Sequence, residues 1–462
     1  MKRSHLPFRN EISEEQESLD PRFVYADWLE EQGNPLGEFI RTQIALSELP
    51  QRHARCAELK SRELQLQRQY QKGWVRDLRP FVQRWEFHNG LVEGIAISAE
   101  QFLEHAAAIK SMFPIRNCRF LDTRKHLTAL AESSSLAGLH NVDLSGERLG
   151  RWGEFQTYET ERNLLKLLGS EHLAEVRHLG LAGNRVNGSV LKAIEEIRFQ
   201  KINSIDLYRN VNITTESLGR FLSAYPIQKL RVSYTQHQDL SGDWRIQSTV
   251  AFAQQILASP SLRQIEILER GLWFGHLGSE FDSSKTAFES VSFRGNLVLG
   301  GDGGAFSPTT QRADFTHASN LLKSADSVNL SACGIDPTSC RALLQTRDWS
   351  SVVRFDLSNN PLGEEGLDLV ASYSSWDELS ELRISSLQPV YSGPVSFGAD
   401  SYRLTDASMR EFCASLAFPR LSKLELTRHQ FTADTAKKIV ASPWICQLYH
   451  LDLSKNQFGD DG

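Results

Sequence analysis

The stretch that decides the fold is "FDLSNNPLGEEG", residues 355–366, and it returns at residues 451–462 as "LDLSKNQFGDDG". In the first copy Phe355 and Leu357 flank Asp356, the alternation of a short strand that buries one face. A polar turn follows, and the chain then continues as "GEEGLDLVASY", with the apolar spacing of a helix. A strand, a turn and a helix therefore form the unit of the fold.

This phrase has eleven copies in the second two-thirds of the chain. The copies begin at residues 139, 176, 202, 227, 262, 288, 325, 352, 379, 421 and 448. Most successive starts lie 25–27 residues apart, and four gaps of 35–42 residues contain roughly 10 to 15 extra residues. The sequence therefore predicts a repeat array with four insertions, at 146–161, 234–247, 296–315 and 387–403.

The ninth position of the phrase is often an asparagine. It holds Asn184, Asn210, Asn296, Asn360 and Asn456, and Cys333 and His429 stand at the same position in other copies. Side-chain amides there would satisfy turn backbone groups. The pattern resembles leucine-rich repeats of the ribonuclease-inhibitor-like class, over residues 92–462. The resemblance implies an α/β, right-handed solenoid with a parallel concave sheet and convex helices.

Three segments are expected along the chain: a helical domain at 1–84, a hairpin with N-terminal capping repeats at 85–138, and leucine-rich repeats at 139–462. Residues 20–43, "DPRFVYADWLEEQGNPLGEFIRTQ", resemble the bacterial repeat-companion domain of planctomycete-type proteins. That resemblance implies a position beside repeats and no activity. Asn89-Gly90 predicts a hairpin turn, and Ser98 with Gln101 predicts a capping box.

The bulk composition excludes several classes of protein. The net charge of −6 and the pI near 6.1 argue against a general affinity for nucleic acid or anionic membrane. The sequence has no apolar run long enough to span a bilayer and no secretory signal. The six cysteines form no CxxC pair, so reduced thiols in a cytoplasmic protein are expected.

One segment departs from the acidic balance. Residues 51–84 contain nine Lys/Arg against three Asp/Glu, a local charge of +6. This face could bind phosphate or a partner, or it could be a solvated helix face. We favour the second interpretation, and nucleic acid is not the expected partner.

No catalytic, cofactor or metal motif is recognisable. The chain lacks a phosphate-binding GxxxxGK[ST] loop, HExxH and GxSxG. The glycine-rich 299–306 lacks the lysine of such a loop and is expected to be a loop inside an insertion. A Cys–His or Ser–His pair assembled in space stays open from sequence alone.

The expected function is therefore protein recognition. The residue between the two strand apolars should face the concave side, and this row is charged; its candidate contacts are Asp206, Arg231, Glu266, Asp356 and Arg383. The insertions should emerge along one edge of the array, because all four follow a strand. Their aromatic residues, and two from an uninserted turn, are candidate interface anchors: Trp152, Phe155, Tyr158, Tyr234, Trp244, Trp273, Phe274, Tyr391 and Tyr402.

Three alternatives are kept. The edge aromatics could fold back and plug the array, the chain could be the sensor or targeting subunit of a larger enzyme or effector system, or a hydrolase site could be hidden in the fold. The eleventh copy ends at Gly462 after its turn, so we expect an incomplete last repeat whose Leu451, Leu453 and Phe458 lack a covering unit, and truncation is our first interpretation.

Overall fold

A computed structural model gives the fold of the chain. It describes residues 7–8, 11–12, 18–49, 55–147, 158–184, 186–197, 199–208, 210, 213–233, 259, 261–268, 290–294, 322, 325–331, 333, 335–345, 348–373, 376–386 and 403–460. The chain divides into two compact units, Met1–Val232 and Ser233–Gly462, which are described separately.

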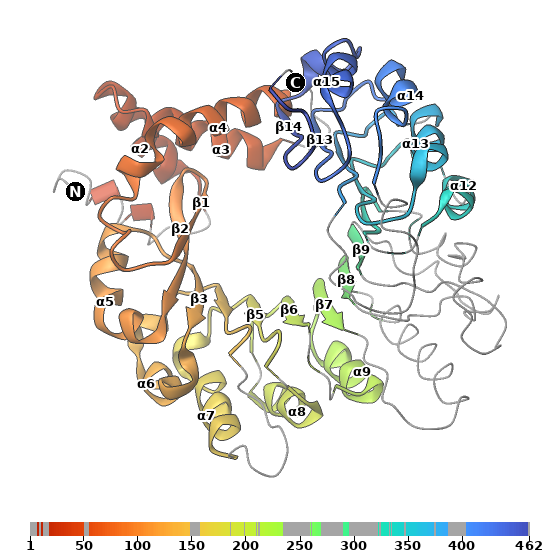
Figure 1. The fold of residues 1–462 in the computed structure, drawn as a ribbon. Helices are drawn as coiled ribbons and strands as arrows, with labels where there is room; N and C mark the ends of the chain where they lie inside the picture. Colours follow the sequence, from red (N-terminus) through yellow and green to blue (C-terminus); the bar gives the residue numbers. More distant parts are fainter. Residues whose placement is uncertain are drawn as a thin grey trace, which may run out of the picture. The chain divides into compact units, whose positions relative to one another are not determined.

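The described elements of unit 1 run from helices α2, α3 and α4 into alternating strands and helices (Figure 1). Its helices are α2 (Asp20–Glu31), α3 (Leu36–Glu48), α4 (Arg55–Trp74), α5 (Ala99–Met112), α6 (Leu127–Glu132), α7 (Tyr158–Leu168), α8 (Gly188–Ile197) and α9 (Thr215–Ala224). Its strands are β1 (Arg84–His88), β2 (Leu91–Ser98), β3 (Asn117–Leu121), β4 (Asn141–Asp143), β5 (His178–Gly180), β6 (Ser204–Leu207) and β7 (Lys229–Ser233). Single 3₁₀ turns lie at Thr123–Lys125, Ser134–Leu136 and Glu171–Leu173.

In its described residues, unit 2 also alternates strands and helices. Its strands are β8 (Gln264–Leu268), β9 (Ser290–Arg294), β10 (Ser327–Asn329), β11 (Arg354–Asp356), β12 (Glu381–Arg383), β13 (Lys423–Glu425) and β14 (His450–Asp452). Its described helices are α12 (Pro337–Gln345), α13 (Gly363–Ser372), α14 (Met409–Ala414) and α15 (Ala433–Val440), with a 3₁₀ turn at Ile445–Gln447.

The strands follow the order of the sequence in each unit. Unit 1 runs from β1 to β7 and unit 2 from β8 to β14. Only the first pair, β1–β2, is antiparallel; β2 to β7 and β8 to β14 pair in parallel with their chain neighbours. In Figure 1 the helices α5 to α9 lie on one side of strands β2 to β7, and α12 to α15 on one side of β10 to β14. The expected α/β repeat fold is confirmed.

The register confirms the repeat phrase. Phe355 pairs with Leu382, Leu382 with Leu424, and Leu424 with Leu451, so the first apolar positions of four copies form one row. The first three are almost fully buried, whereas Leu451 in the last strand is 37% exposed. The expectation that Leu451 is uncovered is therefore correct.

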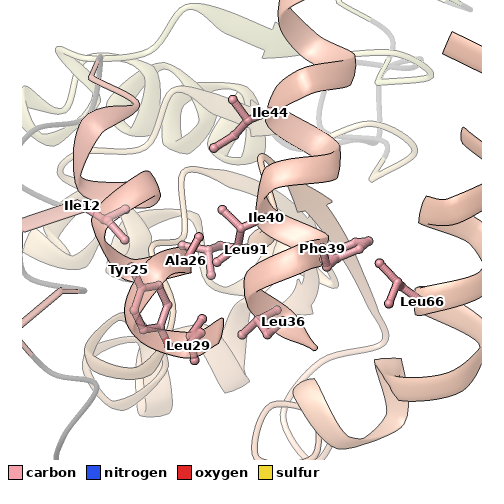
Figure 2. Packing of buried hydrophobic residues seen from close by; sticks show 10 residues of the cluster. All are labelled: Ile12, Tyr25, Ala26, Leu29, Leu36, Phe39, Ile40, Ile44, Leu66 and Leu91. Atoms are coloured by element: carbon pink, nitrogen blue, oxygen red, sulfur yellow. The ribbon is translucent and has the colours of Figure 1, made fainter. Parts of the chain in front are cut away.

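The N-terminal helices pack around their own core, shown in Figure 2. Leu29, Phe39 and Ile40 of α2 and α3 contribute fully buried side chains, and Leu66 of α4 and Leu91 of β2 complete the cluster. Gly33 has a positive φ of 64°, as the end of α2 requires. The N-cap of α2 is Leu19, and no side chain caps the helix there.

The hairpin between α4 and the repeats forms at the expected turn. Asn89 and Gly90 both have positive φ, and the strands on either side pair His88 with Leu91. The amide of Gly90 donates to Gln43 Oε1 at 2.6 Å, and a Cβ at Gly90 would lie 2.3 Å from Ile40 Cα. The turn therefore packs directly on α3, and glycine is required there. Ser98 accepts from the amide of Gln101, as the capping box predicts.

A buried ion pair joins the helical segment to the sheet. Arg22 of α2 is 1% exposed and its Nη2 binds Glu93 Oε1 of β2. Arg116, after α5, lies 4.0 Å from the other oxygen of Glu93 and donates to the carbonyl of Ile12. Because these partners lie on both segments, the N-terminal helices and the first strands of unit 1 are one packed body.

Candidate partner-binding surface

The strand face of each unit presents one row of side chains from the middle of the repeat phrase. The parallel register aligns Arg119, Asp143, Gly180, Asp206 and Arg231 in unit 1. It aligns Asn329, Asp356, Arg383, Glu425 and Asp452 in unit 2. Most of these residues are half-buried, so they line the face without entering the core. The expected position of Asp206, Arg231, Asp356 and Arg383 on one face is therefore observed within each unit.

The row has two kinds of members, and the first kind maintains the turn. A side-chain oxygen of each accepts a hydrogen bond from the amide two residues later, at 2.8–3.0 Å; these residues are Asp143, Asp206, Asn329, Asp356 and Asp452. Such side-chain-to-backbone bonds close an Asx turn. These four aspartates and Asn329 are thus part of the fold, a role that the sequence interpretation missed.

The second kind consists of charged side chains that form ion pairs with neighbouring strands and take no part in a turn. Arg231 binds Asp206 Oδ2 at 2.8 Å and its guanidinium lies 4.6 Å from the ring centroid of Tyr208. In unit 2, Arg383 lies 3.4 Å and Lys423 3.0 Å from Glu425 Oε1. Arg119 lies 3.7 Å from Asp143. Neighbouring strands therefore place opposite charges side by side, and the face is charged but largely neutralised.

Two further rows of polar groups explain how the turns stack. The hydroxyl of Ser358 accepts from the amide of Ser385, and that of Ser385 from the amide of Thr427, each in the following repeat. Asn360 reaches the opposite way: its Oδ1 accepts from Cys333 and Ile335, and its Nδ2 donates to Leu330. Each repeat is therefore hydrogen-bonded to both neighbours through its turn.

The asparagine ladder forms at Asn184, Asn210, Asn360 and Asn456, whereas Asn296 lies outside the described residues. Asn210 repeats the pattern of Asn360, with Nδ2 donating to Leu181 O at 2.9 Å and Oδ1 accepting from Val186 N at 2.8 Å. His429 serves through its ring nitrogens, and its structural role was expected from sequence. Glu147 also stands at the ninth position and accepts from the amide of Thr123 at 2.8 Å. The sequence pattern did not indicate Glu147, because it was based on asparagine. At this position a side-chain oxygen that accepts a hydrogen bond is sufficient.

The aromatic half of the candidate site lies outside the described residues. This holds for Trp152, Phe155, Tyr234, Trp244, Trp273, Phe274, Tyr391 and Tyr402; Tyr158 begins α7, but its side chain is not described. Their expected role as interface anchors remains a prediction. Glu266 is described and is half-buried on β8. Tyr208, which sequence reasoning did not single out, lies two positions after Asp206 and therefore shares its face.

One serine–histidine pair has the distance of a nucleophile and its base. His178 Nδ1 lies 2.7 Å from Ser204 Oγ on the adjacent strand, and burial lowers the pKa of His178. In the described part of the chain no carboxylate hydrogen-bonds to this imidazole, and the amide of Ser204 is bonded within the sheet. Without an orienting group and a free amide donor, this pair alone does not make a catalytic site.

The thiols are unsuited to nucleophilic chemistry. All six cysteines are free, and five are buried. Burial raises the pKa of Cys118, Cys333 and Cys413, and it raises that of Cys340 to about 12. These thiols stay protonated at neutral pH and pack as small apolar groups. No group of His, Cys, Asp and Glu within the described ranges could hold a metal ion, and no described helix is long and apolar enough to cross a membrane.

The family comparison agrees with the geometry. A Leucine Rich repeat model matches residues 448–462, the strand and turn of the last copy. The match covers the copy of the repeat phrase whose strand, β14, pairs in register with β13.

Solved structures similar to this chain were also found. They include the leucine-rich repeat-containing protein LegL7 from Legionella pneumophila (16% identity, TM-score 0.38, 71% of this chain and 88% of that one). The structure of the Rad7 and Elc1 complex in yeast has 12% sequence identity and a TM-score of 0.40, and the match covers 98% of this chain and 87% of that one. The internalin inlF from Listeria monocytogenes has 14% identity and a TM-score of 0.30, and the match covers 71% of this chain and 78% of that one. A search of curated proteins found no match.

Proposed function

We propose that the protein is a non-catalytic scaffold that recognises a protein partner through its strand face. The observation that carries the proposal is the arrangement of Arg231, which is held by Asp206 and lies over the ring of Tyr208. An arginine fixed in this way loses little side-chain entropy on binding, and Arg and Tyr are the residues that most often dominate protein interfaces. Asp206 closes its own turn, and in the proposal the partner contacts the guanidinium of Arg231 and the ring of Tyr208, which lie together on the strand face.

Unit 2 supplies a second charged stretch of the same kind. Arg383 is half-exposed beside Glu425, and Arg354 on the adjacent strand donates to Ser327. Charges arranged in this way give specificity and orientation more than affinity. In the proposal they select the partner, and the aromatic residues of the insertions, such as Trp152 and Trp244, supply apolar contact area.

The proposal also covers the role of residues 1–84 and the cellular setting. We propose that residues 1–84 are a companion domain of the repeats; the buried pair of Arg22 and Glu93 supports this, since it attaches the helices to the first repeat strand. We also propose a reducing, cytoplasmic setting, supported by five buried free thiols.

Affinity capture from the native host tests the function. The bait proteins are the wild type, Tyr208→Ala/Arg231→Ala on the strand face, and Trp152→Ala/Trp244→Ala/Tyr391→Ala at the edge. Lys192→Ala/Glu196→Ala, which removes an exposed pair on α8, is the control. The proposal expects one partner that the wild type and the control recover and the strand-face variant loses. Equal recovery by the correctly folded strand-face variant would refute the proposal. The edge variant tests the aromatic residues separately.

A further inference from the structure

The surface of α4 changes character halfway along the helix. In its first half, Arg62 makes two hydrogen bonds to Glu38 of α3, at 2.5 and 2.7 Å, and Glu63 accepts from Gln43 at 2.6 Å. Hydrogen bonding to Arg62 lowers the pKa of Glu38. The charges of this half are therefore matched by the helix packed beside it.

The end of α4 and the turns that follow it carry four exposed basic residues that the helix packed beside α4 does not match in the described residues: Arg68 and Lys72 on α4, and Arg76 and Arg79 after it. The helical path continues past Trp74, because the amide of Val75 bonds to Gln71 and the amide of Arg79 to Val75. Spacings of four, four and three residues place these side chains within an arc of about 80° and over about 16 Å. We call this set the basic ridge.

Only one member of the basic ridge meets an acidic group in the described residues. Arg76 lies 3.5 Å from Asp77, its chain neighbour, and is itself 82% exposed. Lys72 lies in the last turn of α4, where the helix dipole favours a positive charge. Arg76 and Arg79 follow this end of the helix and are favoured in the same way, whereas the dipole does not explain Arg68. Like charges three and four residues apart destabilise a helix by about 0.2–0.5 kcal/mol per pair, so the ridge is a net cost to the isolated fold.

We propose that the basic ridge docks an acidic polypeptide segment. Four cations on one face match carboxylates spaced three or four residues apart, and guanidinium groups bind carboxylates through two parallel hydrogen bonds. This site is separate from the strand face, and its partner contact is electrostatic.

Two observations favour an acidic peptide over a nucleic acid. The described rings beside the ridge, Tyr70 and Trp74, are partly buried and pack against the core: Trp74 lies 4.8 Å from Phe39 and 6.1 Å from Tyr70, between ring centroids. In the described residues these ring faces are therefore occupied by other rings and do not form an open platform for stacked bases. Moreover, residues 51–84 carry +6 in a chain of −6, so the rest of the chain carries −12 and repels an extended polyanion.

Fluorescence anisotropy with the full-length protein tests the proposal. The probe is a labelled peptide of about fifteen residues, with four glutamates spaced like the ridge charges. Competing probes are the same peptide with its glutamates clustered at one end, a single-stranded DNA of equal charge, and vesicles containing phosphatidylserine. Titrations are run at about 50 mM and about 300 mM NaCl, because screening should weaken the contact.

The ridge variant is Arg68→Gln/Lys72→Gln/Arg76→Gln/Arg79→Gln. Its matched control is Arg124→Gln/Lys125→Gln/Arg220→Gln/Arg410→Gln, which removes the same charge at exposed positions elsewhere. We expect the ridge variant to bind the spaced peptide about ten- to a hundredfold more weakly, with the control unchanged. Circular dichroism confirms that both variants are folded.

Four results would overturn the proposal. They are absence of peptide binding to the wild type at low salt, equal loss in the ridge and control variants, equal affinity for the spaced and clustered peptides, and tighter binding of DNA or vesicles than of the spaced peptide. If the ridge variant does not fold, the pair Arg68→Gln/Lys72→Gln, which leaves the turn after α4 intact, is compared with Arg124→Gln/Lys125→Gln. The expected loss is then about three- to tenfold.

Discussion

The Nε2 atom of His429 lies 2.6 Å from the carbonyl oxygen of Ile384, in the preceding repeat. On the other side of the ring, Nδ1 accepts from the amide of Leu404 at 3.2 Å. The ring must therefore be neutral, with its proton on Nε2. A histidine here does what the asparagine amide does in other repeats, but it adds a titratable group to a buried ladder.

His429 should make unit 2 sensitive to acid. Burial lowers its pKa to about 4, whereas in the unfolded chain it is near 6.5. Between these values the unfolded chain binds a proton that the native state does not, so stability falls as the pH drops through this window. The difference is about 3 kcal/mol. Urea unfolding of His429→Asn from pH 4 to 7.5 should show a flatter profile than the wild type. His88→Asn, at an exposed position, is the control, and an unchanged slope for His429→Asn would contradict the assignment.

The two polar positions of a repeat should differ in their effect on stability. Asn360→Ala removes hydrogen bonds to Cys333, Ile335 and Leu330 and leaves those groups buried, which should cost about 3–5 kcal/mol. Asp356→Ala removes a half-exposed turn bond and should cost about 1 kcal/mol. Denaturant unfolding of the two variants checks this order, and a reversed order would show that the ladder is not the main link between repeats.

Gly90→Ala should disrupt the docking of the hairpin on α3. The new methyl would lie 2.3 Å from Ile40 Cα, and φ is +85°. We expect a loss of more than about 3 kcal/mol from the clash and the strain. Gly33→Ala has a similar positive φ but nothing within 4 Å, so it should cost only about 1 kcal/mol. Thermal unfolding of the two variants separates the steric clash from the backbone strain. Equal losses of stability in Gly90→Ala and Gly33→Ala would mean that packing on Ile40 is unimportant.

Arg22→Met should destabilise unit 1 strongly. It leaves the carboxylate of Glu93 buried with only Arg116 nearby, at 4.0 Å, and breaking a buried pair typically costs about 3–5 kcal/mol. The double variant Arg22→Met/Glu93→Gln removes the isolated charge and should regain part of the loss. Calorimetry of the two variants checks this relation, which fails if the double variant is the less stable one.

Much of the fold could be predicted because its signals are local. The alternation around Asp356, the Asn89-Gly90 turn and the capping box at Ser98 each depend on a few adjacent residues, and all three formed as expected. The strand-face row was also predicted, since side chains alternate along a strand.

The roles of individual polar residues were harder to predict. Asp356 looked like surface charge, yet it closes its own turn, and Glu147 took the role of an asparagine. Both roles depend on where a neighbouring amide lies, which a spacing pattern does not state. The partner of Arg22 is 71 residues away in the sequence, beyond the reach of any periodicity.

Within each unit, the pairing of strands that are neighbours in the chain has a consequence for how the chain folds. The backbone amide of Ser422 donates to the carbonyl of Ser380, and the loop that this bond closes is one repeat with its insertion. Extending a loop from about 27 to about 42 residues adds only about 0.4 kcal/mol of closure entropy. Since contacts stay this local, folding can nucleate in any repeat and spread outward, and a long insertion slows the process little.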